Sequence, residues 1–212
     1  MADNYLEKRY DEVFGKGAKS ARPSRPGLDV LLKNNRSYRG YDRSYEVKML
    51  QLRRMIEVNT KIASAMNQQV LRFRPVLRGP EADRVNSLIR MGAALKELNL
   101  PFSGTEPEAF IVICSTVPES RFVDMDLGIS MQSMSLKAVE MGLNCLMVCN
   151  FNKQNLKDAL ELPYDPIAVL AVGKGAEKIE MVPVNGDQPL DYYRVDSTHY
   201  VPKICADDLM IK

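Results

Sequence analysis

The sequence contains a single histidine, His199, among its 212 residues. A Ser-His-Asp triad, histidine acid–base catalysis and a zinc site are therefore poorly supported, and a lone histidine is more typical of a surface position than of a catalyst. Cysteine is also scarce, with four residues in apolar or strand-like stretches, where reduced thiols pack as small hydrophobic groups. We expect no structural disulfide among Cys114, Cys145, Cys149 and Cys205.

Long apolar runs are missing as well. No stretch approaches the roughly 20 apolar residues that a membrane-spanning helix needs, and the first 17 residues lack the apolar core of a signal peptide. We therefore expect a soluble, cytoplasmic protein without a membrane partner. The composition, 45% hydrophobic and 26% charged, is that of a globular chain, and its length suits one α/β domain with its own core.

Charge of one sign is in small excess, with a net charge of +2, so the overall field makes no strong case for nucleic acid. The excess is uneven, because residues 16–43 carry eight Lys or Arg against Asp29 and Asp42 alone. For residues 16–26, rich in Gly and Pro, we favour a solvated arm. The alternative, a non-enzymatic module that binds RNA, DNA or an acidic partner through residues 16–43, stays open.

The order of expected elements indicates an α+β fold with a central, partly antiparallel sheet flanked by helices. Residues 1–27 form an N-terminal extension, and 28–212 form a single domain. We expect helices at 4–14, 28–33, 46–62, 80–98, 127–141 and 153–161, strands at 73–77, 109–115, 143–149 and 167–172, a turn at 185–186 and a short apolar element near residue 209.

The segment 126–163 is the most informative one. Apolar residues from Leu127 to Met141 recur in steps of three and four, which places them on one helical face. Gly142 ends that helix, a short apolar strand follows, and Asn152 is suited to cap the next helix. This pattern of residues resembles that of the nitroreductase family of FMN-dependent oxidoreductases. The matching residues are Asp126, Gly128, Ile129, Gln132, Gly142, Leu143, Leu162 and Pro163.

A second motif, Asn35 to Tyr41, places two guanidinium groups and a hydroxyl within four residues. Arginine suits a phosphate or an electron-rich ring edge, and serine suits a polyol. The motif resembles the Arg-Ser-x-Arg cofactor motif of the family, although Asn35 stands where members often carry another arginine. The resemblance implies that Arg36, Ser37 and Arg39 bind FMN.

Three further segments complete the resemblance. Residues 63–69 resemble a Pro-Ser-x-x-Asn-x-Gln loop that reaches the flavin of the other subunit, with Ala63 in place of the proline. Residues 148–151 occupy the place of a Gly-Gly-Phe turn whose amides approach flavin N5 and O4, and Lys203 fits a C-terminal basic segment that returns to the phosphate. The implied FMN contacts are Ser64, Ala65, Asn67, Gln69, Val148, Cys149, Asn150 and Lys203.

The resemblance implies an intertwined homodimer with FMN at its interface. It also implies ping-pong chemistry, in which hydride passes from NAD(P)H through flavin N5 to a nitroaromatic, a quinone or a similar small acceptor. No protein side chain is then expected to act as a catalytic residue, and no metal is expected. A family member specialised for reductive dehalogenation or enone reduction remains an alternative.

Overall fold

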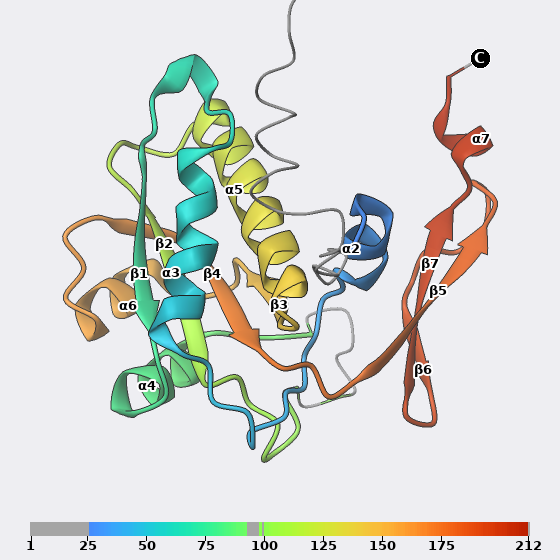
Figure 1. The fold of residues 1–212 in the computed structure, drawn as a ribbon, viewed down its shortest axis with the longest axis horizontal. Coiled ribbons are helices and arrows are strands. Elements are labelled where there is room, and N and C mark those ends of the chain that lie inside the picture. The colour runs from blue at the N-terminus through green and yellow to red at the C-terminus, as the bar shows by residue number, and fades with distance from the viewer. Residues whose placement is uncertain (1–25, 93–97, 99, 212) are drawn as a thin grey trace, which may run out of the picture.

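The computed structural model describes residues 26–92, 98 and 100–211. The helix expected at 4–14 and nearly all of the N-terminal extension lie outside the described residues. The helix expected at 80–98 is shorter than predicted, because it ends at Leu88 and Ile89 forms a β-bridge with Phe151. Within the described part, the chain forms a helix-covered four-stranded sheet and a separate three-stranded sheet (Figure 1). No helix among those residues is long and apolar enough to cross a membrane.

The main sheet has the order β1-β2-β4-β3, and all its neighbouring strands are antiparallel. Its strands are β1 (Leu71–Val76), β2 (Ala109–Ser115), β3 (Asn144–Val148) and β4 (Asp165–Gly173). All four strands expected before residue 173 are thus present. The two central strands are buried almost throughout, as expected for strands covered on both faces.

Alternation along the central strands produces two separate cores. Ala109, Ile111 and Ile113 of β2 pack with α3 (Met49–Ile56) and the long α5 (Arg121–Glu140), which lie side by side over one face (Figure 1). Phe110 and Val112 point the other way, toward α4 (Pro80–Leu88) and α6 (Lys153–Ala159). The α+β architecture expected from the sequence is confirmed.

Local signals place several helix ends correctly, although α5 begins at Arg121, six residues before the expected start at 127. Gly142, with φ of +76°, follows α5, and the Asn152 side chain accepts a hydrogen bond from the Asn155 N–H at the start of α6. The helix expected at 28–33 is α2 (Leu28–Asn34). The long helix expected at 46–62 is shorter, because α3 passes into the 3₁₀ turn η1 (Glu57–Thr60), and η2 (Ala65–Asn67) follows.

The C-terminal region differs from the expectation. Beyond the expected turn and the short α7 (Ala206–Leu209), it contains β5 (Lys178–Val184), β6 (Tyr193–Val195) and β7 (Thr198–Ile204). The strand order is β5-β7-β6, with β5 parallel to β7 and β6 antiparallel to it. This C-terminal arm, residues 178–209, projects from the main body beside α2 (Figure 1).

Candidate functional site

The segment Asn35 to Gly40 runs along β3, which is an edge strand of the main sheet. The Tyr38 N–H donates to the Cys145 carbonyl oxygen at 3.2 Å, and Ser37 forms a bridge with Cys145. On the other side, Glu177 accepts hydrogen bonds from the N–H groups of Arg39 and Gly40. The segment is therefore fixed between the main sheet and the start of the arm.

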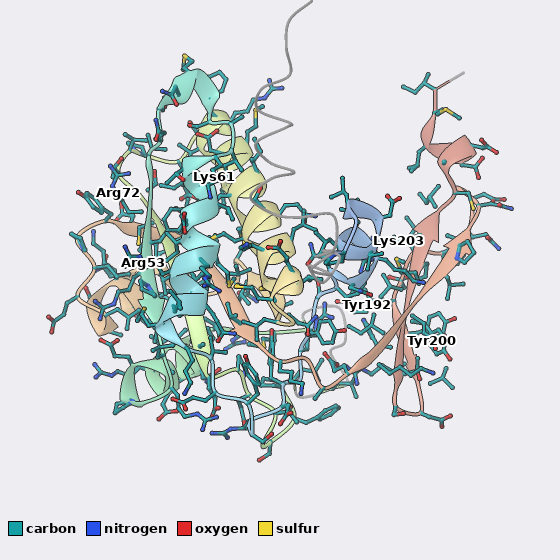
Figure 2. The ribbon with its side chains drawn as sticks, viewed as in Figure 1. Arg53, Lys61, Arg72, Tyr192, Tyr200 and Lys203 are labelled. Atoms are coloured by element: carbon teal, nitrogen blue, oxygen red, sulfur yellow. The ribbon has the colours of Figure 1, made fainter. Side chains whose placement is uncertain are left out.

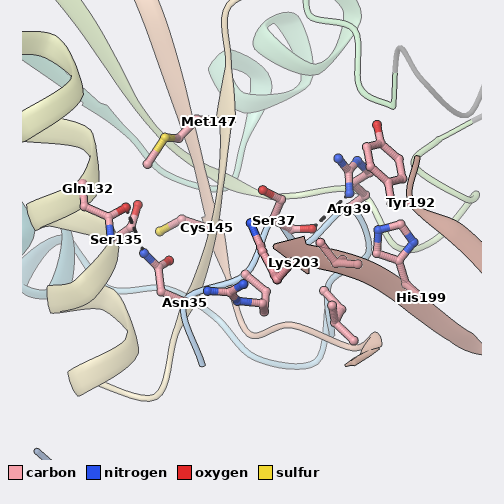
Figure 3. Close-up of a pocket in the computed structure, with 13 residues that line it drawn as sticks. Asn35, Ser37, Arg39, Gln132, Ser135, Cys145, Met147, Tyr192, His199 and Lys203 are labelled. Carbon is pink, nitrogen blue, oxygen red and sulfur yellow. Dashed lines mark hydrogen bonds between the residues drawn. The ribbon is translucent and has the colours of Figure 1, made fainter. Parts of the chain in front are cut away.

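A cavity of about 340 Å³ lies where these parts meet. Residues of the 35–39 segment, α5, β3 and the arm line it, and Figure 3 shows their side chains converging from these elements. The lining residues are Asn35, Arg36, Ser37, Arg39, Gln132, Ser135, Cys145, Met147, Ile179, Tyr192, His199, Val201 and Lys203. The predicted residues Arg36, Ser37, Arg39 and Lys203 are thus brought together.

Strand β7 contributes to the cavity through alternate residues. His199, Val201 and Lys203 occupy positions i, i+2 and i+4, which share one face of a strand. Lys203 therefore reaches the same space as Arg36, although 167 positions separate the two residues in the sequence. The pairing of β7 with β5 and β6 sets this geometry.

The cavity carries uncompensated positive charge. Among the described residues, no carboxylate forms an ion pair with Arg36, Arg39 or Lys203, although eleven other Lys or Arg residues have such a partner. The buried Nε atoms of Arg36 and Arg39 also have no hydrogen-bond partner in the described part of the chain. Burial lowers the pKa of Arg36. Unpaired guanidinium groups in a cavity are suited to an anion.

The remaining contacts of the two arginines orient them. Arg36 Nη2 donates to the Leu32 carbonyl oxygen at 2.7 Å, and Nη1 lies 3.1 Å from the Met181 sulfur in β5. The Arg39 guanidinium stacks on Tyr192, with its Cζ atom 5.0 Å from the ring centroid. These contacts restrict both side chains and do not involve the Nε atoms.

His199 is buried, with 2% of its surface exposed, so the surface position expected from the sequence is wrong. Its ring packs against Tyr192 at a centroid distance of 5.1 Å. Burial lowers the pKa of His199 to about 4, and the charges of Arg39 and Arg194 act in the same direction. The imidazole is therefore neutral at pH 7. In the sequence, only the spacing of four positions between His199 and Lys203, which puts both on one face of a strand, could have indicated that His199 lines the cavity.

Cys145 also lines the cavity but is not suited to nucleophilic chemistry. Burial raises the pKa of its thiol to about 12, so the thiolate is essentially absent at neutral pH. All four cysteines are free thiols.

The residues predicted from the 64–69 loop lie elsewhere. Ser64 and Gln69 line a second cavity, of about 210 Å³, beside η1, β1 and the N-terminal half of α5. Ala65 and Asn67 belong to the same loop but do not line that cavity. In Figure 2, Lys61, which precedes this loop, lies well away from Lys203. A single chain therefore does not bring the loop to the first cavity, which contains Arg36, Arg39 and Lys203 and is called the cationic cavity below.

Asp126 holds this loop in place, a role that the sequence did not reveal. Its buried carboxylate accepts hydrogen bonds from the Ser64 hydroxyl and the Ala65 N–H, both at 2.7 Å. Three non-glycine residues of the loop, Met66, Asn67 and Gln69, have φ between +49° and +55°. Such strained backbone persists only where its surroundings fix it, and it is frequent at ligand sites.

Val148, Cys149 and Asn150 line neither cavity. Val148 points into the core on the α4–α6 side of the sheet, whereas Cys149 and Asn150 are exposed beyond the end of β3. Their neighbour Met147 is the β3 residue that joins Cys145 in the first cavity. The assignment of residues 148–150 to a ligand therefore stays a prediction.

Comparison with known proteins identifies the family. The family model described as "Nitroreductase family" matches residues 32–174, about two thirds of the chain. The match includes the 35–40 segment, the 64–69 loop and α5, and ends before the C-terminal arm. This chain belongs to the nitroreductase family. A comparison with curated protein sequences finds no match.

Solved structures show the same fold at low sequence identity. A nitroreductase family protein from Streptococcus pneumoniae TIGR4 has a TM-score of 0.60 and 16% identity, over 78% of this chain and 97% of that one. An FMN-dependent nitroreductase from Clostridium difficile R20291 has a TM-score of 0.57 and 18% identity, over 70% of this chain and 87% of that one. A protein of Exiguobacterium sibiricum 255-15, determined in complex with FMN, has a TM-score of 0.58 and 18% identity, over 72% of this chain and 90% of that one.

Proposed function

We propose that this protein is an FMN-dependent oxidoreductase that uses NAD(P)H to reduce a small acceptor such as a nitroaromatic or a quinone. The observation that carries the proposal is the cavity, where three cations have no ion-pair partner and two buried Nε atoms have no hydrogen-bond partner among the described residues. These groups fit a phosphate dianion, and the chain belongs to a family in which relatives of the same fold use FMN.

Bound FMN supplies a ring that accepts hydride from a reduced nicotinamide and passes it to the acceptor. The protein contributes binding and orientation. Arg36, Arg39 and Lys203 hold the phosphate, and the Ser37 hydroxyl contacts the polyol chain. The backbone amides of residues 148–150, at the end of β3, are proposed to donate to the ring edge, where they stabilise charge that arrives with the hydride.

We further propose that the working unit is a homodimer in which the 64–69 loop of one chain completes the site of the other. Support comes from the separation of the loop from the cationic cavity within one chain. Support also comes from α5, whose outer face exposes Phe122, Met125 and Ile129 with Gly128 between them. Apart from the helix's own backbone and the two neighbouring residues, no atom of the described part lies within 4 Å of a Cβ built on Gly128, so a second helix can approach closely there.

The colour and flavin content of the purified protein test the cofactor. We expect flavin absorbance, release of FMN rather than FAD on denaturation, and rebinding of added FMN by the stripped protein. A colourless protein that does not bind added FMN would contradict the proposal.

Variants of the cationic cavity test the phosphate site. Each charge-assisted contact is worth roughly 1.5–3 kcal/mol, so Arg36→Ala and Lys203→Ala should each weaken FMN binding about 10-fold or more. Binding of riboflavin, which lacks the phosphate, should change little. Arg53→Ala on the exposed surface of α3 serves as the matched control (Figure 2). Unchanged FMN affinity in both cavity variants would show that the phosphate lies elsewhere.

Turnover is tested with the FMN-loaded protein. NADH or NADPH alone, without oxygen, should bleach the flavin absorbance, and steady-state kinetics with a nitroaromatic or quinone should give parallel double-reciprocal lines. Failure of both nicotinamides to bleach the flavin would leave a flavin-binding protein with another donor. The same assay with a halogenated aromatic or an enone separates the specialised family reactions.

Assembly is tested by Met125→Glu, which places a charge in the exposed apolar stripe of α5. Sedimentation should show loss of the dimer, and FMN retention should fall with it. Tyr164→Glu, in the turn between α6 and β4, is a control at a comparably exposed apolar residue. A stable parent monomer that retains FMN at saturation would contradict the shared site.

The non-enzymatic alternative has less support. Of the basic segment 16–43, the described arginines make contacts within the chain. Arg43 pairs with Glu106 and Glu108, while Arg36 and Arg39 line the cavity. A gel shift that weakens with salt, from a protein without flavin, would favour that alternative.

A further inference from the structure

We propose that His199 is an additional ligand of the FMN phosphate, with Nδ1 as the contacting atom, and that its imidazole takes up a proton when the phosphate enters the cavity. This inference rests on the proposed function, because the identity of the anion comes from there. It adds a residue outside the family-model match, in the C-terminal arm.

The geometry carries the inference. His199 is almost fully buried, lines the cationic cavity and lies on the same face of β7 as Lys203. Its Nδ1 atom is buried and has no hydrogen-bond partner among the described residues. Buried polar atoms in native proteins are nearly always paired, so an unpaired nitrogen in a residue that lines a cavity indicates a partner from outside the chain.

The charged surroundings of His199 are positive. Arg39 faces it from the 35–40 segment, Arg194 from β6 and Lys203 from its own strand, whereas Tyr192 contacts its ring and Ile179 of β5 adds no charge. Glu177, the acidic group that contacts both arginines, is already engaged by Arg194 and by the Arg39 N–H. Figure 3 shows Arg39, Tyr192 and His199 grouped at one end of the cavity. A phosphate dianion is the kind of group that makes a protonated imidazole favourable there.

The direction of the proton linkage follows from these charges. In the free protein, burial and the two arginines lower the pKa of His199 to about 4, so the imidazole is neutral at pH 6–8. A dianion next to Nδ1 raises the pKa in the complex. The contribution of His199 to FMN affinity is therefore present below the pKa of the complex and is lost as pH rises through it.

Because His199 is the only histidine, its titration can be followed without resonance assignment. Protein labelled with ¹⁵N-histidine, free of any histidine tag, is titrated by NMR alone, with saturating FMN and with saturating riboflavin. We expect no titration above pH 5 for the free protein or the riboflavin complex, and a midpoint at least one unit higher with FMN. The ¹⁵N shifts also report which ring nitrogen carries the proton.

Two variants give an independent readout in FMN affinity. His199→Leu removes the nitrogen and should weaken FMN binding about 10-fold or more at pH 6, with riboflavin binding unchanged. His199→Asn places an amide near the Nδ1 position and should restore part of the affinity. Because an amide does not titrate, this variant should lack the proton uptake by the side chain, which is measured by comparing FMN-binding enthalpies in two buffers. The FMN phosphate titrates near pH 6 itself, so each variant is compared with the parent at the same pH.

The outcomes separate this inference from the proposed function. If FMN binds tightly and the midpoint of the His199 titration does not change, the inference alone is overturned. The same holds if riboflavin shifts that midpoint as much as FMN does. A parent protein that does not bind FMN overturns the proposed function and the inference with it. Because the NMR titration uses the parent protein, the test does not depend on the folding of a variant.

Discussion

Glu177 joins the 35–40 segment to the C-terminal arm, and its removal should lower the stability of the protein. Its carboxylate accepts from the N–H groups of Arg39 and Gly40 and forms an ion pair with Arg194. The side chains of Glu177 and Arg194 are only 10% and 16% exposed. We predict that Glu177→Ala destabilises the protein strongly, because it leaves a largely buried guanidinium and two backbone donors without their acceptor.

The magnitude can be bounded from measurements on similar pairs. Breaking a buried ion pair by removing one partner costs about 3–5 kcal/mol, a large share of a typical stability of about 5–15 kcal/mol. Glu177→Gln keeps an acceptor oxygen and should cost less, about 1–3 kcal/mol. Glu119→Ala is the control, because the Glu119–Lys153 side chains are 45% and 47% exposed and such pairs are worth at most about 1 kcal/mol.

Urea denaturation followed by far-UV circular dichroism gives the free energies of unfolding. The chain has no tryptophan, so tyrosine fluorescence, to which Tyr192, Tyr193 and Tyr200 of the arm region contribute, provides the second probe. If the arm unfolds first in Glu177→Ala, the two transitions separate. A Glu177→Ala variant whose loss of stability equals that of the Glu119→Ala control would refute the reasoning.

Three further predictions follow from single contacts. Asp126→Ala should cost about 1–3 kcal/mol and expose the 64–69 loop to limited proteolysis, because the Ser64 hydroxyl loses its acceptor; equal proteolysis of variant and parent would contradict this. Gly175→Ala places a Cβ 2.2 Å from the Tyr38 ring, so stability and FMN affinity should both fall, whereas Gly27→Ala, with nothing within 4 Å, should not alter either. At pH 8 a thiol reagent should label the two exposed cysteines promptly and spare the two buried ones, whose pKa values are raised to about 11 and about 12; prompt labelling of all four would show that the core opens.

The strands of the main sheet were predicted well from the sequence, because the local residue patterns agree with which strands are buried in the structure. The β2 strand has the predicted bounds, Ala109–Ser115, and the Gly142 and Asn152 signals mark the helix ends. Burial on both faces leaves β2 and β4 almost wholly apolar, which is a strong pattern. The identity of the family also came from this region.

The C-terminal arm could not be predicted in the same way. In β5 and β6 the residues are half-buried or exposed, and in β7 only Thr198 and His199 are buried, so the apolar pattern is weak. A proline in β5 and another in β7 weaken the strand signal further. Its partners are also distant in sequence, since Lys203 pairs with Pro183 across parallel strands. The surface position expected for His199 was therefore wrong, because local sequence does not reveal that the arm folds back beside the 35–40 segment.

The arrangement of the candidate site suggests why helix α5 carries the longest recognisable motif. Its N-terminal half holds the 64–69 loop through Asp126, and its C-terminal half lines the cationic cavity through Gln132 and Ser135. Its outer face is the exposed apolar stripe proposed to meet a second chain. If two copies of α5 pack antiparallel, each N-terminal half lies beside the C-terminal half of its partner. Such packing moves the loop of one chain toward the cavity of the other, so one helix would set both the dimer and the ligand site.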